Sequence, residues 1–371
     1  MRAFAIDDEG NQDPDDALSL EGERLWVHVA DVAALIAPDS PADIEARARG
    51  ANLYLPEGIA PMLPPRATQM LGLGLAEISP ALSFGLDLNP AGEATGLEIT
   101  PSWVRVERLT YEQVESRLEE EPFKRLHCLA LANGERRQAR GAISIDWPEV
   151  KVRVEGGIVR ITPLTPLKSR ELVAEAMLMA GAAAARFALD RLIPFPFSTQ
   201  EPPAESGPFP DGLAGAFARR RTLRRSQLKS VHGLHAGLGL EAYAQATSPL
   251  RRYLDLVVHQ QLRACLCGGK ILGAGELLER VGAAQAITGA VRQAERQSIR
   301  HWTLVYLREK PGSRWEGILV DKRERRATLV IPELGLEVGV SLPRDLPLNA
   351  AVQLELISVD LPRLEAHFQV V

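Results

Sequence analysis

Residues 6–20 read IDDEGNQDPDDALSL, a polar loop between two apolar stretches. The loop carries four closely spaced carboxylates, at Asp7, Asp13, Asp15 and Asp16. Apolar residues alternate with others on both sides of the loop, which predicts one short strand before it and another after it. These apolar residues are Phe4, Ile6, Leu18 and Leu20. Strands on both sides would anchor the carboxylates to a buried core.

Carboxylates packed this closely repel one another and raise each other's pKa unless a cation neutralises them. Oxygen ligands in this number suit Mg²⁺, Mn²⁺ or Ca²⁺ better than zinc, and no cysteine or histidine stands close by. Spacing alone is more typical of an exposed acidic turn. A calcium loop is a further alternative, although the order does not match the EF-hand pattern. Anchored carboxylates are also what a two-metal phosphodiester site requires.

The bulk composition is that of a globular protein. A chain of 371 residues, 46% hydrophobic and 25% charged, predicts two or three domains. Its three cysteines form neither a metal-ligand pattern nor an even disulfide set, which fits a reducing cytoplasm. The N-terminus lacks the apolar core of a signal peptide, and the most apolar helix, near residues 172–188, is too short and too charged to span a bilayer. We expect a cytoplasmic protein with no membrane partner, and no obligatory protein partner is evident.

A basic stretch offsets the net charge of −5, which by itself argues mildly against a nucleic-acid partner. Residues 212–240 contain no acidic side chain but hold six basic ones close together, at Arg219, Arg220, Arg221, Arg224, Arg225 and Lys229. Such a stretch fits a solvated helix face and fits a wall that contacts phosphates equally well.

Periodicity along the chain predicts a mixed α/β domain over residues 1–310 and a small all-β domain over residues 312–371. Helices are expected at 42–53, 111–118, 122–140, 167–192, 219–229, 248–265 and 275–307. Hairpins are expected at 81–109, turning at 89–92, and at 142–162, turning at 156–157. The pair Pro311-Gly312 marks the clearest boundary. Five short strands after it predict a small closed barrel such as an OB-fold.

The loop at residues 6–20 resembles the characteristic motif of the ribonuclease II and ribonuclease R (RNB) family, an aspartate followed six residues later by D-x-D-D. The four aspartates of the loop match those positions one for one. The resemblance continues in family order over about residues 1–310, through VHVADVAALI, GANLYLPEGIAPMLPP, RLTYEQVE, RGAIS, LVAEAMLMA, GLEAYAQATSPLRRYLDLVVH and QAERQ. It implies a catalytic domain with a buried RNA channel, followed by an RNA-binding OB-fold.

The resemblance further implies 3′-to-5′ hydrolysis of single-stranded RNA to nucleoside 5′-monophosphates, with two Mg²⁺ ions or Mn²⁺ as a substitute. It implies that the metal ligands are Asp7, Asp13, Asp15 and Asp16, with Asp16 also tied to catalysis. Arg251 in SPLRRY would contact the scissile phosphate, and Glu295 in QAERQ the terminal ribose. Tyr54 and Tyr111 would stack on bases. Further RNA contacts are expected from Arg252, Arg220 and Arg224.

Four positions depart from the family pattern: Val152, where a second clamp aromatic is usual, Gly181, Ala246 and Gln260. None of them belongs to the aspartates or to Arg251, so they bear on how RNA is held. Two alternatives stay open, a non-catalytic RNA-binding protein on the same fold and a calcium-stabilised structural domain. The family's cold-shock domains do not precede the aspartate motif, so the chain is expected to be a minimal member or a piece of a longer protein.

Overall fold

The computed structural model describes residues 2–205, 207–323, 326–342 and 345–371. Its larger part is built on a closed five-stranded barrel in the order β1-β2-β3-β6-β7. The strands are β1 (Arg2–Asp7), β2 (Asp16–Glu21), β3 (Arg24–Ala30), β6 (Ser79–Leu88) and β7 (Ala94–Thr110). β1 runs parallel to β7, and the other neighbours are antiparallel. The two strands predicted to flank the carboxylate loop are confirmed.

Two helices cover the barrel and complete its core. α5 (Lys168–Asp190) packs against α4 (Phe123–Ala139), and its alanine-rich face is buried with barrel residues such as Phe4 and Phe84. The expectation that this helix is too short and too charged to span a bilayer is wrong, because by length and composition α5 is apolar enough to cross a membrane. However, 61% of its most apolar window is buried inside the protein. Small side chains on α5 let it lie close to the strands. The apolarity of α5 is therefore explained by packing.

Shorter elements surround the barrel. They are α1 (Pro41–Arg49), β4 (Leu53–Leu55), β5 (Gly58–Ala60), α2 (Pro65–Leu71), α3 (Tyr111–Glu115), β8 (Val150–Glu155), β9 (Ile158–Pro163), β10 (Phe197–Thr199), α6 (Gly212–Thr222), β11 (Gln227–Lys229) and α7 (Tyr253–Cys267). α1 starts where the sequence predicts, because the Ser40 side chain accepts from the Asp43 amide. α3 starts at a capping box formed by Thr110 and Gln113.

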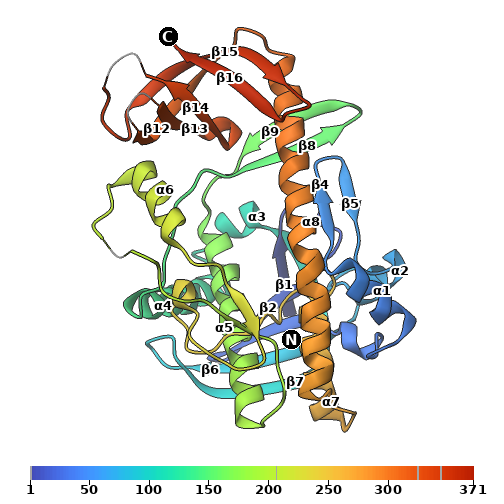
Figure 1. Cartoon of the computed structure of the whole chain (residues 1–371). Helices are drawn as coiled ribbons and strands as arrows, with labels where there is room; N and C mark the ends of the chain where they lie inside the picture. Colours follow the sequence, from blue (N-terminus) through green and yellow to red (C-terminus); the bar gives the residue numbers. More distant parts are fainter. Residues whose placement is uncertain (1, 206, 324–325, 343–344) are drawn as a thin grey trace.

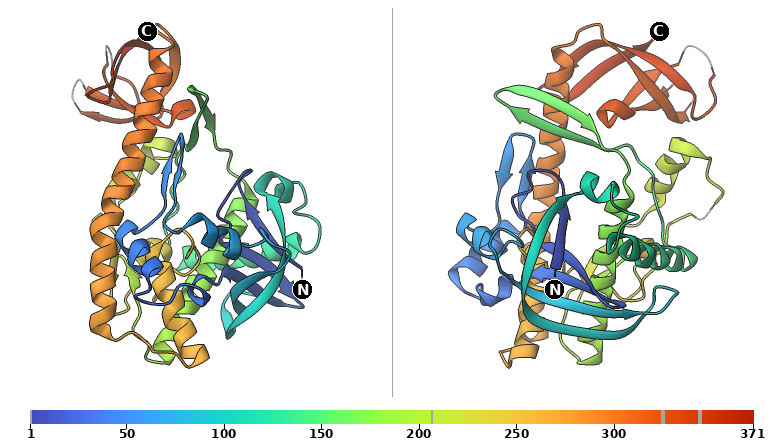
Figure 2. Two further views of the ribbon diagram at one scale, coloured as in Figure 1. Left: turned by 90° about the vertical axis from the view of Figure 1, so that its right-hand side faces the viewer. Right: turned by 180° about the vertical axis from the view of Figure 1, so that it is seen from behind.

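The long helix α8 (Ala274–Arg308) connects the two parts of the molecule, as Figures 1 and 2 show. Beyond it lie β12 (Arg314–Arg323), β13 (Arg326–Ile331), β14 (Leu336–Ser341), β15 (Ala351–Asp360) and β16 (Glu365–Val370). They form an antiparallel sheet in the order β14-β13-β12-β15-β16 with a core of its own, curled into a nearly closed barrel. The predicted mixed α/β fold with an all-β barrel at its end is confirmed.

Four helix predictions include residues that are not helical. The helix expected at 42–53 ends at Arg49, before β4 begins at Leu53, and the helix expected at 111–118 ends at Glu115. The expected helix at 219–229 ends at Thr222, and residues 227–229 instead form β11, which pairs with β10. The expected helix at 248–265 begins only at Tyr253, because residues 248–252 form turns in which the Arg251 and Arg252 amides donate to the Ser248 carbonyl. Distant contacts override the local helical preference in the last two segments. Residues 227–229 pair with β10, and near the turn the Leu250 amide donates to Asp15 and the Tyr253 amide to the Gly50 carbonyl.

Candidate active site

The four aspartates lie at one end of the barrel, where β1 passes into β2. Asp7 is the last residue of β1 and Asp16 the first of β2, while Asp13 and Asp15 lie between them and are buried. Both strands are fixed in the barrel by their apolar faces, which is why the carboxylates are held inside the protein and not in an exposed turn. The interpretation as a solvent-exposed acidic turn is therefore wrong.

Asp13 and Asp15 are bound by protein groups from distant segments. The Asn52 side-chain amide and the Tyr54 hydroxyl donate to Asp13 Oδ2 over 2.7 and 2.5 Å. The Leu250 amide donates to Asp15 Oδ1 over 2.8 Å, and Arg251 Nε lies 3.1 Å from Asp15 Oδ2. The carboxylate loop is thereby tied to β4 and to the turn before α7.

Asp7 and Asp16 accept no hydrogen bond from a distant segment of the described chain. Asp7 accepts from the Asn11 side chain and, over 2.8 Å, from the Asp8 amide. The Asp16 carboxylate accepts no hydrogen bond from any part of the chain that the structure describes. The quartet thus divides into two carboxylates that hold the framework and two that remain more open to a ligand.

Buried negative charge makes these carboxyl groups weak acids. Burial raises the pKa of Asp16 to about 7, although Arg251 opposes the shift and Asp7 adds to it. Burial also raises the pKa of Asp7, and that of Asp15 well above its usual range. A cation among them would relieve this cost.

The donor set fits a hard divalent cation, because it consists of carboxylate oxygens. The buried Asp15 Oδ2 accepts no hydrogen bond and instead forms the ion pair with Arg251 at 3.1 Å. The side chains are not arranged as a finished site, however. No group of three or more His, Cys, Asp or Glu side chains within the described ranges is placed to hold a metal ion. The expected Mg²⁺ therefore stays a prediction.

Arg251 lies beside the quartet, and Arg252 is turned into the framework. The Arg251 side chain is 43% exposed and donates to Ser248 Oγ over 3.2 Å, so its guanidinium remains accessible while it is paired with Asp15. Arg252 instead forms an ion pair with the buried Asp255 over 2.6 Å. Asp255 also accepts from the Ser248 amide over 2.9 Å. Arg251 is therefore accessible to a ligand, whereas Arg252 stabilises the turn before α7.

Tyr54, Tyr111 and Glu295 also gather near the aspartates. Asp7 pairs with Thr110 in the barrel, so Tyr111 follows directly beside that carboxylate. Burial and then the charges of Asp7 and Asp16 raise the pKa of Tyr111. Glu295 on α8 accepts from the Tyr54 amide over 3.0 Å and so fixes the strand that carries this tyrosine. These three predicted residues are brought together with the quartet.

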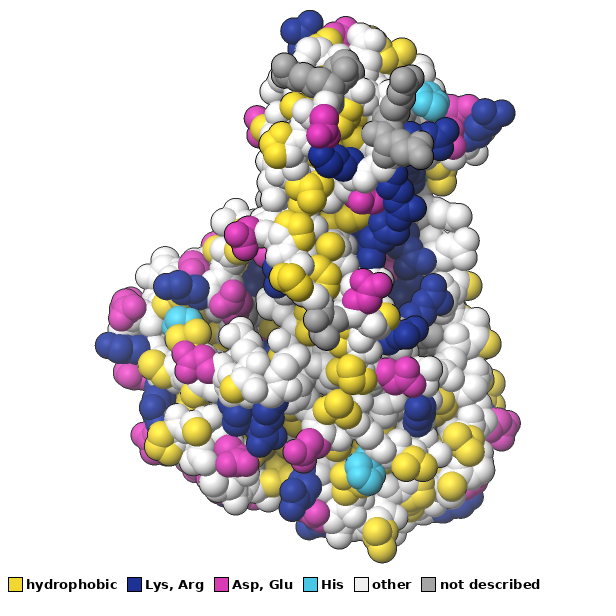
Figure 3. Space-filling model, turned by 60° about the vertical axis from the view of Figure 1, so that its left-hand side comes forward, with side chains coloured by type: hydrophobic (Ala, Val, Ile, Leu, Met, Phe, Trp, Pro, Cys, Tyr) yellow, Lys and Arg dark blue, Asp and Glu magenta, His cyan; other side chains and the backbone are white. Residues whose placement is uncertain are grey.

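Arg220 and Arg224 lie elsewhere. Arg220 pairs with Glu337 of the C-terminal barrel, and its guanidinium lies 4.1 Å from the centre of the Trp147 ring. Arg224 is exposed, and its carbonyl accepts from the Gln200 side chain over 2.6 Å. Figure 3 shows Lys and Arg side chains gathered along the hollow between the C-terminal barrel and the body below it. The expected RNA contacts of Arg220 and Arg224 stay predictions, and Arg220 is already used at the junction of the two parts.

Three residues at the site were not expected from the sequence: Asn52, Asp8 and Arg170. Asn52 holds Asp13, while Asp8 forms ion pairs with Lys151 and Arg170. Only Asp8 gave a signal, as a further acid in the loop. Asn52 lies in the quoted stretch GANLYLPEGIAPMLPP, two residues before Tyr54, but nothing in that stretch indicates that it holds Asp13. Arg170 lies outside the quoted stretches and reaches the site through folding.

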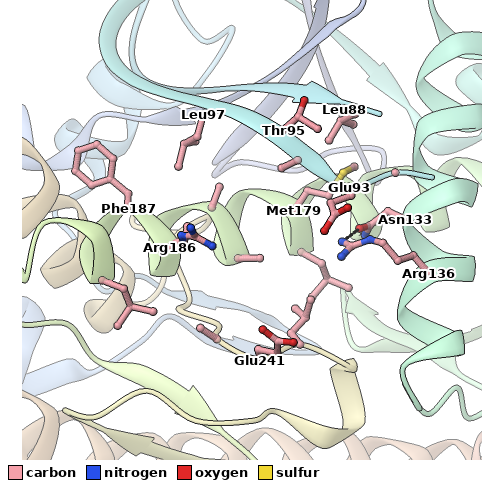
Figure 4. A pocket seen from close by; sticks show the side chains of 18 of the residues that line it. Leu88, Glu93, Thr95, Leu97, Asn133, Arg136, Met179, Arg186, Phe187 and Glu241 are labelled. Carbon is pink, nitrogen blue, oxygen red and sulfur yellow. Dashed lines mark hydrogen bonds between the residues drawn. The ribbon is translucent and has the colours of Figure 1, made fainter. Parts of the chain in front are cut away.

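A separate cavity of about 620 Å³ lies between the β6–β7 hairpin, α4 and the C-terminal half of α5. Figure 4 shows an apolar side formed by Leu97 and Phe187, with Arg136, Glu93 and Asn133 grouped at one end. Acidic and basic side chains are mixed in its lining, and none of the predicted site residues belongs to it.

Comparison with known proteins identifies the fold and the family. The family model of the RNB domain matches residues 1–207 and 215–268. The chain belongs to the RNB family of ribonuclease II and ribonuclease R. A second model, the C-terminal S1 domain of ribonuclease II-type exonucleases, matches residues 313–371.

Several RNB proteins resemble the chain. An uncharacterized ribonuclease of Synechocystis is 36% identical over 100% of this chain and 59% of that protein. The chloroplastic and mitochondrial ribonuclease II of Arabidopsis thaliana is 28% identical over 91% of this chain and 45% of that protein. The chain thus spans about half the length of these relatives.

Solved RNB structures share the fold. Ribonuclease R of Mycoplasma genitalium, in complex with ribose-methylated single-stranded RNA, superposes with a TM-score of 0.87 at 17% identity, over 100% of this chain and 70% of that one. Yeast Ssd1, a pseudonuclease, superposes with a TM-score of 0.74 at 18% identity, over 92% of this chain and 49% of that one.

The departures from the RNB pattern lie in packed surroundings. A Cβ at Gly181 would lie 2.3 Å from the Tyr243 ring, so glycine makes room for that ring. The Ala246 carbonyl accepts from His259 over 2.6 Å, and Gln260 donates to Asp43 over 2.9 Å. Each position is buried or closely packed against the framework and does not line the carboxylate quartet. These departures are consistent with an intact site.

Proposed function

We propose that the chain is the catalytic part of a 3′-to-5′ hydrolytic exoribonuclease that degrades single-stranded RNA to nucleoside 5′-monophosphates. The observation that carries the proposal is the aspartate quartet, in which Asp13 and Asp15 are buried, with a partly exposed arginine paired to Asp15. Membership of the RNB family supports it. The cytoplasm is the proposed location, in keeping with three cysteines that form no disulfide.

We propose Mg²⁺ as the cofactor, held by Asp7, Asp13, Asp15 and Asp16. When bound there it would supply Lewis acidity for phosphodiester hydrolysis. Asp16 would be the main ligand, because its carboxylate accepts no hydrogen bond within the described residues, whereas Asp7, Asp13 and Asp15 each already accept at least one.

The other residues have proposed roles that follow from their chemistry. Arg251 carries an always-charged, planar guanidinium, which suits it to the scissile phosphate and to the charge that develops during hydrolysis. Tyr111 and Tyr54 offer rings on which bases can stack without reading sequence. Glu295 retains a second carboxylate oxygen that can accept from the ribose 2′-hydroxyl, a donor that DNA lacks.

A second candidate function is RNA binding without cleavage. The fold likeness to a pseudonuclease favours it, as does the use of Asp13 and Asp15 in framework hydrogen bonds. This candidate predicts binding of single-stranded RNA with no turnover in any divalent cation.

The two functions are separated by incubating 5′-labelled oligoadenylate with the protein and Mg²⁺, with chelator, and with the Asp16→Asn variant. We expect progressive shortening from the 3′ end and release of nucleoside 5′-monophosphate by wild type only. A substrate blocked at its 3′ end should resist, and one blocked at its 5′ end should not. Intact RNA that stays bound to wild type would refute the nuclease proposal, and equal cleavage by Asp16→Asn would refute the role of Asp16.

A further inference from the structure

Asp8 follows Asp7 in the carboxylate loop, yet it faces two cations instead of the other aspartates. Its carboxylate lies 2.7 Å from Lys151 Nζ on β8 and also pairs with Arg170 on the first turn of α5. Asp8 is thus a charged link between three separate segments.

Arg170 continues this link to Tyr111. Its guanidinium carbon lies 4.1 Å from the centre of the Tyr111 ring, within the range of a cation–π contact. One face of the ring is therefore covered by Arg170, and the ring is fixed from that side. The side chains of Asp8, Arg170 and Tyr111 form a continuous carboxylate–guanidinium–aromatic contact next to the quartet.

The space behind this contact is open. Lys151 and Arg170 line a cavity of about 530 Å³ together with Arg153 and Arg160 from the β8–β9 hairpin. The side chains of Asp8 and Arg170 are each 30% exposed. Replacing either one therefore leaves no buried void, so the fold does not depend on the pair in the way it depends on a core residue.

We propose that Asp8 is a positioning residue for the 3′ end of the RNA, which rests on the proposed nuclease function. Asp8 holds Arg170 flat against one face of Tyr111, so that the ring presents its other face to a base in a fixed orientation. Through Lys151 it also holds the β8–β9 hairpin close to the quartet. This fixed ring compensates for Val152, which is buried and offers no second aromatic face.

Simple electrostatics makes the opposite prediction for the same residue. RNA carries negative phosphates, and Asp8 is a negative charge near the quartet. If charge alone mattered, Asp8→Asn would tighten RNA binding. If Asp8 positions Tyr111, the same substitution frees Arg170 and the ring, and binding weakens. Whether Asp8→Asn weakens or tightens RNA binding therefore decides between positioning and simple charge repulsion.

The test measures the dissociation constant of 5′-labelled oligoadenylate in chelator, and KM and kcat in Mg²⁺. For Asp8→Asn and for Arg170→Met we expect binding about tenfold weaker, in keeping with the contribution of one stacked base. KM should rise more than kcat falls. The double variant should be no weaker than either single one, because both remove the same contact. Asp8→Glu should restore binding, and Arg170→Lys should not, because an ammonium cannot lie flat on the ring.

Arg160→Met is the matched control, because Arg160 lines the same cavity but contacts neither Asp8 nor Tyr111. Unchanged or tighter binding by Asp8→Asn would overturn the inference, as would additive losses in the double variant. Failure of wild type to degrade RNA would instead refute the proposed function, whatever the variants do. Thermal unfolding of each variant confirms that its fold is retained.

Discussion

Replacing Asn52 by alanine tests how firmly the carboxylate loop is tied to the rest of the protein. Asn52 is almost fully buried and uses both ends of its amide. Its nitrogen donates to Asp13 Oδ2 over 2.7 Å, and its oxygen accepts from the Met62 amide over 2.6 Å. Alanine removes both contacts at once.

The expected loss of stability follows from the two polar groups, the Met62 amide and the Asp13 carboxylate, that lose a hydrogen bond in Asn52→Ala. The Met62 amide loses its acceptor in a buried place, which costs about 1–3 kcal/mol. Asp13 loses a hydrogen bond to a charged group, worth about 1.5–3 kcal/mol, although the Tyr54 hydroxyl remains as a donor. We therefore expect Asn52→Ala to lower the free energy of unfolding by about 4 kcal/mol, a large share of the stability of a typical domain.

Urea unfolding in chelator measures this loss, and Asn52→Asp is the matched control. Aspartate keeps an oxygen for the Met62 amide but turns a second oxygen toward Asp13, so it isolates the contact with the loop. A loss below about 1 kcal/mol for Asn52→Ala would refute the reasoning as a whole. A neutral Asn52→Asp would show that the contact with Asp13 contributes little.

Three further outcomes are expected. Burial lowers the pKa of His28 from 6.5 to about 4, so between these values the unfolded chain binds a proton that the folded one does not. The contribution of His28 to stability should therefore fall by about 2 kcal/mol from pH 7.5 to pH 5, while the raised pKa values of Asp7, Asp15 and Asp16 act in the opposite direction. Relative to wild type, His28→Gln should gain about 2 kcal/mol over this range in urea unfolding. Gly181→Ala should lower the melting temperature, because its Cβ meets the Tyr243 ring and overpacking costs about 1–3 kcal/mol. Arg220→Met should cost less than about 1 kcal/mol in the same assay, because Arg220 and Glu337 are both more than a third exposed.

Local sequence patterns predicted the strands and turns whose conformation is favoured by neighbouring residues in the chain. The alternation around the carboxylate loop and the glycine pair at 156–157 are sufficient to indicate strands and a turn, and both are found. The helix expected at 219–229, by contrast, does not form over its second half. Its arginines favour a helix, but residues 227–229 gain hydrogen bonds from β10, which lies some thirty residues earlier in the chain. Pairing of that kind leaves no local periodicity to detect.

The sequence predicted the main residues of the candidate site, but it did not predict the hydrogen bonds and ion pairs that hold them in place. The four aspartates and Arg251 could be named because their motifs are contiguous. Asn52 and Arg170 could not, because each reaches the loop across a long stretch of sequence, over 39 residues to Asp13 and 162 residues to Asp8. Asn52 lies in a stretch that resembles the family, but that stretch does not indicate its contact with Asp13, and Arg170 lies outside the quoted stretches. Such partners follow only from the fold.

The parallel pairing of β1 with β7 explains why an aromatic ring lies beside the quartet. Parallel strands end at the same edge of a sheet. In this register Asp7 stands opposite Thr110, so the next residue of the chain, Tyr111, emerges beside the carboxylates. The capping box at Thr110 then turns the chain at once into α3 and holds the ring there. The barrel thus delivers the carboxylate and the ring to one place, and Asp8 with Arg170 has only to fix the ring's orientation.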